Sequence, residues 1–170
     1  MYLDRFKLTG RVAVVTGGGQ GIGLACVEAL SEAGAHVTIA DRDPRAADDG
    51  RAKMKDKGCA IDVIAMDVTD SAQVDAAAAR VLKERGRIDV LVCSAGVVRP
   101  DTAAEEVSDA DWLDVVNVNL NGVFWCWRSA GPCWRRDAVR SSTSARCPGS
   151  SPTSRNRRPI TTRPRPPCIT

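Results

Sequence analysis

The sequence predicts an α/β fold in which a parallel β-sheet is covered by helices on both faces. Over the first 130 residues, short β-branched runs alternate with longer alanine-rich stretches, and a glycine-rich segment follows the first run. A third observation limits the predicted size of the sheet. Residues 131–170 hold nine arginines, one acid and seven of the nine prolines. We therefore expect the sheet to be truncated after a fourth strand and its helix, with a disordered tail beyond.

Four strand-then-helix units are predicted within residues 1–130. Near-continuous apolar runs, typical of strands buried on both faces, cover 11–16, 36–41, 60–67 and 88–96. Each is followed by a stretch with helical spacing or helix-boundary residues, at 22–34, 44–58, 71–86 and 108–131. We expect Ser71 and Ser108 to cap the last two helices. Short connections between such units favour parallel strands.

The charge of the chain changes at the same boundary. Residues 1–130 carry a net charge of −5 and residues 131–170 carry +8. The overall charge of +3 is therefore a property of the tail and gives no reason to expect a nucleic-acid partner for the domain. We treat 1–130 as the folded unit and 131–170 as an Arg/Pro/Ser-rich tail.

Cysteine usage and hydropathy indicate the compartment. The seven cysteines show no CxxC or other metal-type spacing, so we expect no metal site and a reducing environment. The N-terminus lacks an apolar signal core, and no run approaches the roughly 20 apolar residues of a membrane span. We expect a cytoplasmic protein without a membrane partner. The only histidine, His36, has no acid or cysteine pair near it in the sequence, which favours a structural role.

The segment "TGGGQGIG" at 16–23 is the first candidate site. Glycines between a strand and a helix let the backbone turn and approach a pyrophosphate, while the helix N-terminus supplies free N–H groups. The alternative is a tight turn that binds nothing. The residues expected to bind a cofactor here are Thr16, Gly17, Gly19, Gln20, Gly21, Ile22 and Gly23.

The second candidate site is the end of the second strand, where Asp41 follows Gly21 by 20 residues. An acid there can accept the hydroxyls of an adenosine ribose and repel a 2′-phosphate, which favours NAD over NADP. Arg42 follows directly and could bind a phosphate instead. A solvated strand-end residue is the alternative for Asp41.

These features together resemble the short-chain dehydrogenase/reductase family, through "TGGGQGIG", "AD" at 40–41, "MDVTD" at 66–70, "CSAG" at 93–96 and "NVNLNGVF" at 117–124. The resemblance implies a Rossmann-type doubly wound sheet. It places Asp67 and Val68 beside the adenine and Ala95 and Gly96 beside the nicotinamide ribose. Cys93, also expected at the cofactor site, stands where the family usually has asparagine, which removes a side-chain amide near the cofactor and implies a buried thiol. Asn119 matches the asparagine that holds a water in the proton relay, its alternative being a polar residue facing solvent.

The family's proton-transfer residues are absent from the sequence. The resemblance calls for a serine, a tyrosine and a lysine four residues later, yet the only tyrosine is Tyr2 and no lysine follows Lys83. Codons permitted by residues 132–170, shifted by two nucleotides, encode a string containing G-A-I-V-N-I-G-S-M-S-G and Y-N-A-S-K without a stop. We therefore expect a frameshift near residue 131, in the gene or in its sequencing.

The resemblance implies an NAD-dependent oxidoreductase that moves a hydride between nicotinamide and an alcohol or carbonyl carbon. The shifted string is most similar to sugar-alcohol and polyol dehydrogenases, so a small-molecule polyol is the expected substrate of the intact parent. This chain itself is expected to be inactive. In relatives the helix matching 108–130 packs against its copy, which implies a homo-oligomer. The alternative is a non-catalytic NAD-binding protein whose basic tail engages an acidic partner or nucleic acid.

Overall fold

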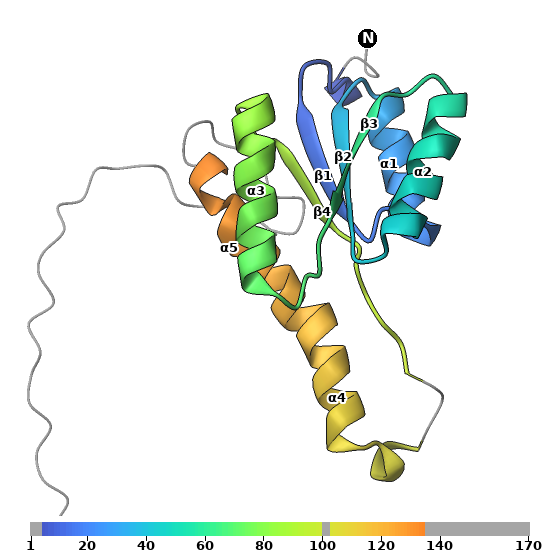
Figure 1. Cartoon of the computed structure of the whole chain (residues 1–170), viewed down its shortest axis with the longest axis vertical. Helices are drawn as coiled ribbons and strands as arrows, with labels where there is room; N and C mark the ends of the chain where they lie inside the picture. Colours follow the sequence, from blue (N-terminus) through green and yellow to red (C-terminus); the bar gives the residue numbers. More distant parts are fainter. Residues whose placement is uncertain (1–4, 100–102, 135–170) are drawn as a thin grey trace, which may run out of the picture. The chain divides into compact units, whose positions relative to one another are not determined.

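The computed structural model describes residues 5–99 and 103–134. Nearly all of the predicted tail, and Tyr2 with it, lie outside these residues. The described part contains four strands: β1 (Val12–Thr16), β2 (His36–Asp41), β3 (Ile61–Ala65) and β4 (Val90–Cys93). They form one parallel sheet in the order β3-β2-β1-β4 (Figure 1). The predicted parallel sheet is confirmed, with each strand at its predicted place in the chain.

Helices cover both faces of this sheet, as the sequence predicts (Figure 1). Helices α1 (Gly21–Glu32) and α2 (Pro44–Asp56) lie on one face, and α3 (Ser71–Arg85) and α5 (Gly122–Trp134) lie on the other. Because side chains alternate along a strand, Ala13 and Val15 of β1 join the core under α1 and α2, while Val12 joins the core under α3 and α5. The apolar strand runs are thus buried on both faces.

The predicted helix over 108–131 is in fact three consecutive elements. It consists of α4 (Asp109–Val116), a π-helical turn η3 (Asn117–Asn121) and α5; a short 3₁₀ turn, Ala104–Glu106, precedes them. Ser108 caps α4 as predicted, because its Oγ accepts a hydrogen bond from the Asp111 N–H at 3.1 Å. The prediction for Ser71 is wrong by one residue: Asp70 is the N-cap of α3, since a carboxylate reaches both the Ala72 and Gln73 amides.

His36 does have an acidic neighbour, contrary to the sequence-based expectation. Its Nε2 lies 2.8 Å from Asp62 Oδ2, and Arg85 donates to the same carboxylate at 2.7 Å. The acid lies on β3, 26 residues away, so only strand pairing reveals it. This cluster lies at the amino ends of the strands and supports the structural role predicted for His36.

None of the helices in residues 5–99 and 103–134 combines the length and the hydropathy of a membrane span.

Candidate functional site

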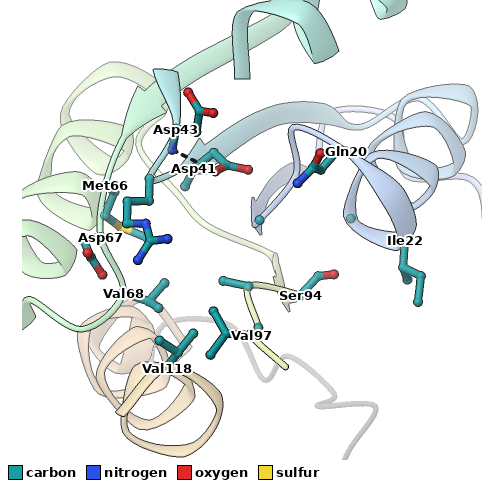
Figure 2. A pocket seen from close by; sticks show the side chains of 16 residues that line it. Gln20, Ile22, Asp41, Asp43, Met66, Asp67, Val68, Ser94, Val97 and Val118 are labelled. Carbon is teal, nitrogen blue, oxygen red and sulfur yellow. Dashed lines mark hydrogen bonds between the residues drawn. The ribbon is translucent and has the colours of Figure 1, made fainter. Parts of the chain in front are cut away.

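A cavity of about 440 Å³ opens at the carboxyl ends of the strands. Figure 2 shows Asp41 and Asp43 from the end of β2, Asp67 and Val68 from the segment after β3, and Ser94 and Val97 from the end of β4. Ligands of open α/β sheets bind outside the carboxyl ends of the strands, where the strand order reverses. The cavity is lined by Gly17, Gln20, Ile22, Gly23, Ala40, Asp41, Arg42, Asp43, Met66, Asp67, Val68, Ser94, Ala95, Gly96, Val97 and Val118.

The glycines of the loop after β1 are required by space and by backbone conformation. Gly17 has a φ of +64°, and a Cβ there would lie 2.7 Å from the Cα of Ala95. A Cβ on Gly23 would lie 2.1 Å from the Gly17 carbonyl oxygen, so the first turn of α1 can pack against the loop only with glycine at position 23. The loop therefore presents backbone, and little side chain, to the cavity.

The N-terminus of α1 is left open to this cavity. Helices α2, α3 and α4 each have a side chain that accepts a hydrogen bond from a first-turn amide, from Asp43, Asp70 and Ser108 respectively. The N-cap of α1, Gln20, makes no such bond, and its first turn holds no acid. The amide donors and positive end of this 12-residue helix are thus available to an anion such as a pyrophosphate.

Asp41 is held in a fixed orientation at the end of β2. Its Oδ2 accepts a hydrogen bond from the Gly19 N–H at 3.0 Å, and its Oδ1 accepts one from the Asp43 N–H at 3.1 Å. Each oxygen of an ionised carboxylate accepts more than one bond, so Asp41 retains capacity for the two hydroxyls of a ribose. Asp43 also lines the cavity and caps α2 by accepting from the Arg45 N–H at 2.9 Å.

Asp67 and Val68 form the wall of the cavity after β3. Asp67 Oδ1 accepts from the N–H and the hydroxyl of Thr69, both at 2.8 Å, which fixes the turn. Val68 is 7% exposed and packs on α5, where a Cβ at Gly122 would lie 2.7 Å from its Cγ2. This side of the cavity is therefore a rigid surface with one carboxylate beside an apolar side chain, a combination that suits a purine base.

The segment after β4 is fixed from two sides. The Ala95 N–H donates to the buried Thr16 Oγ1 at 3.3 Å. Asn119, in the π-helical turn, accepts from the Val97 N–H at 2.9 Å and donates to the Val97 carbonyl at 3.0 Å. The side chain of Asn119 thus binds the backbone of this segment and does not simply face solvent, so its visible role is to position the loop that carries Gly96.

Not every predicted site residue lines the cavity. Thr16, Gly19 and Asn119 support it from behind, and Cys93 packs into the core against the α3–α5 side. Gly21 does not line the cavity either; it is the first residue of α1 and has a φ of +54°. A hydrogen bond between Cys93 and Cys126 lowers the pKa of Cys93, and the same bond with burial raises that of Cys126. Sequence reasoning missed Ala40, Asp43, Met66, Ser94, Val97 and Val118. Of these, Asp43 was recognisable as an N-cap before Pro44. Ala40, Met66, Ser94 and Val118 lie within the family motifs but were not assigned to the site, and Val97 carries no local signal.

The arrangement suits an extended molecule with a phosphate group at its centre. An open helix N-terminus lies between a fixed carboxylate at one end and small residues at the other, and the glycine loop admits close approach of a pyrophosphate. Among the residues described, no three His, Cys, Asp or Glu side chains are grouped to hold a metal ion. The fold and the site together are those typical of dinucleotide-binding α/β domains.

Comparison with known proteins gives the family. The sequence model described as "short chain dehydrogenase" matches residues 11–141, and the chain belongs to this family. Galactitol 2-dehydrogenase of Rhizobium johnstonii is 46% identical over 131 residues, which are 76% of this chain and 50% of that protein. D-threitol dehydrogenase of Mycolicibacterium smegmatis is 41% identical, over 74% of this chain and 48% of its own length. The chain thus spans about half the length of these curated relatives.

Solved structures share the fold. The crystal structure of gox2181 matches with a TM-score of 0.76 and 41% identity, covering 80% of this chain and 53% of that one. The Pseudomonas aeruginosa RhlG/NADP complex matches at 0.72 and 34% identity, covering 78% and 51%. A Brucella melitensis 3-ketoacyl-(acyl-carrier-protein) reductase complexed with NADH matches at 0.72 and 33% identity, covering 77% and 53%. One of these neighbours is thus a complex with NADP and another a complex with NADH.

Proposed function

We propose that residues 11–134 form the NAD-binding half of a short-chain dehydrogenase acting on a polyol or related alcohol. The observation that carries the proposal is the pairing of an uncapped α1 N-terminus with a fixed Asp41 across one cavity. A turn that only connects β1 to α1 would be more stable with a capping side chain at the helix start, which α1 lacks. The galactitol and threitol dehydrogenases among the relatives support the substrate class.

Each group of residues along the cavity would bind a different part of NAD. The amides at the start of α1 would hold the pyrophosphate, Asp41 the adenosine ribose, and Asp67 with Val68 the adenine. Ala95 and Gly96, held by Thr16 and Asn119, leave room for the nicotinamide ribose. Bound NAD would supply the hydride-accepting ring that oxidises the alcohol carbon. The residues of this chain would therefore position NAD, and the glycines would keep side chains out of the part of the cavity that NAD occupies.

Charge at the adenosine end favours NAD over NADP. Three carboxylates line this part of the cavity, Asp41, Asp43 and Asp67, against a single guanidinium, Arg42. A 2′-phosphate would bring about two negative charges next to Asp41, whose orientation the Gly19 and Asp43 amides already fix. Arg42 is exposed and offsets only one of these charges. We propose NAD as the preferred cofactor and the cytoplasm as the place of action.

Proton transfer is the step that this sequence does not provide. A dehydrogenase needs a general base for the hydroxyl proton, and no tyrosine or lysine stands after Lys83. We propose that the chain binds NAD without turning over an alcohol, and that the missing groups are encoded in the shifted frame. Sequencing the gene across codons 125–135 tests this. A reading that confirms codons 131–170, with no dehydrogenase continuation in another frame, contradicts it.

Equilibrium titration of the full chain with NAD and NADP tests the binding proposal. We expect saturable NAD binding, with NADP at least about tenfold weaker, a difference of about 1.4 kcal/mol. The chain should produce no NADH from galactitol or threitol. Equal affinity for NAD and NADP would contradict the proposed NAD preference. The absence of binding at millimolar NAD would contradict the proposed function.

The helices after β4 support a second part of the proposal, self-association. Four large apolar side chains on this segment are exposed by half or more: Trp112, Leu113, Leu120 and Trp127. We propose that a second copy covers them, through the 108–130 segment. Light scattering should give a mass above the 18.1 kDa of one chain, and Trp127→Asp should lower it. A monomer at high micromolar concentration contradicts this.

A further inference from the structure

Gly50 has no local reason to be glycine. It lies in the middle of α2, where glycine is less favourable than alanine, and the helix runs through it from Pro44 to Asp56. Its φ is not among the positive values that glycine permits. Gly50 is buried, on the same side of the helix as the fully buried Ala47 and Met54. Space, and not backbone conformation, must therefore explain it.

The space at Gly50 is taken by the backbone of the glycine loop. A Cβ at Gly50 would lie 3.1 Å from the Gly19 carbonyl oxygen, 3.3 Å from the Gly19 Cα and 3.3 Å from Ile39 Cδ1. In the other direction, a Cβ at Gly19 would lie 2.6 Å from the Ala46 carbonyl carbon and 2.9 Å from the Ala47 nitrogen. The loop and α2 therefore touch backbone to backbone, with a glycine on each side.

Gly19 connects this contact to the cofactor site. Its N–H donates to Asp41 Oδ2 at 3.0 Å, so the position of Gly19 sets the orientation of the carboxylate. We propose that Gly50 is a positioning residue for the adenosine ribose: by lacking a side chain, it lets α2 hold Gly19 where the amide fixes Asp41. The identity of the ligand in this inference rests on the proposed NAD function. The packing of Gly50 against Gly19, and the bond from Gly19 to Asp41, are independent of that function.

The direct test compares Gly50→Ala with Asp49→Ala in the full chain. Both variants place alanine in the middle of α2, but residue 49 is exposed and residue 50 faces the loop. We expect Gly50→Ala to raise the Kd for NAD about tenfold, since Gly19 must move by a few tenths of an ångström. Asp49→Ala should leave the Kd within about twofold of wild type. Equal effects of the two variants would overturn the proposal.

A double-mutant cycle distinguishes positioning through Asp41 from a general loss of structure. If Gly50 acts through Asp41, adding Gly50→Ala to Asp41→Ala should not weaken NAD binding further. If the increases in Kd caused by the two single substitutions multiply in the double variant, the proposal is overturned. Coupling of this kind is not expected of a variant that only loosens the fold.

Amide hydrogen exchange of Gly19 tests the packing without any nucleotide. We expect this amide to be protected in the wild-type chain and to exchange faster in Gly50→Ala, with Val15 of β1 unchanged. An unprotected Gly19 amide in the wild-type chain would overturn the proposal even if Gly50→Ala failed to fold. A wild-type chain that protects Gly19 but does not bind NAD would instead contradict the proposed function.

Discussion

Both ends of the parallel sheet carry charged side chains, but the two ends use them differently. At the amino end, Asp89 accepts hydrogen bonds from Arg11, Arg87 and the Val12 amide, and Asp62 accepts from His36 and Arg85. Within these two clusters the carboxylates form hydrogen bonds with the neighbouring cationic side chains and the Val12 amide. At the carboxyl end, the glycine loop and the start of α1 leave backbone donors without a capping side chain beside a cavity.

The comparison shows that charge alone does not mark the site. The buried carboxylate of Asp89 is the most fully satisfied acid at the amino end and holds the start of β1 beside the start of β4. Asp41 accepts only two backbone amides and keeps capacity for a ligand. Removing the first should therefore cost folding stability, and removing the second should cost binding.

The largest effect is expected at Asp89. Asp89→Ala leaves the Arg11 and Arg87 guanidinium groups without their carboxylate and the Val12 amide without an acceptor, in a site where the side chain is 5% exposed. We expect the free energy of unfolding to fall by about 3 kcal/mol, because the buried Val12 amide loses its acceptor and the charge-assisted hydrogen bonds from two half-exposed arginines are lost. Urea unfolding measures it, with the exposed Asp48→Ala as control. A loss under about 1 kcal/mol would contradict the structural role.

Asp41 should show the opposite pattern. Asp41→Ala removes the carboxylate proposed to accept the ribose hydroxyls, so NAD affinity should fall by about tenfold to a hundredfold. The preference for NAD over NADP should shrink as well, because the repulsion of a 2′-phosphate is lost. Titration with both cofactors measures this, with Asp48→Ala again as control. Unchanged NAD affinity would show that the ribose binds elsewhere.

A smaller effect is expected from acid at the amino end. Although partial burial acts in the opposite direction, hydrogen bonds from His36 and Arg85 hold the pKa of Asp62 below its ordinary value. The unfolded chain therefore binds this proton first, so the contribution of Asp62 is present above about pH 4 and is lost as pH falls through the lower folded-state pKa. Asp62→Asn should make the fall in stability below about pH 4 less steep. An unchanged pH profile would contradict this.

Much of the fold could be predicted because its signals are local. The apolar strand runs, the glycine loop and the Ser108 cap all depend on neighbours in the sequence, and the structure places them as predicted. The break in the long helix could not be predicted, because residues 117–121, Asn-Val-Asn-Leu-Asn, contain no glycine or proline to mark the π-helical turn.

The site was less accessible from the sequence where it depends on tertiary contacts. Asp41 could be recognised from its place after a strand, but its bond to Gly19 and the approach of Gly50 to the loop depend on how α2 packs. Asn119 was identified through family resemblance, and its two bonds to Val97 join residues 22 positions apart. Cys93 was expected to be a buried thiol near the cofactor, and it packs against the core cluster that contains Cys126.

The most direct test is an amide-detected NMR titration of the full chain with NAD, because it reports both ends of the sheet at once. We expect shifts to concentrate at the carboxyl end, in the 17–23 loop, at 41–43, at 67–68 and at 94–97. The amides of Arg11, His36, Asp62 and Asp89 should stay unchanged. Shifts confined to the amino end, or none in the glycine loop at saturating NAD, would contradict the assignment of the binding site.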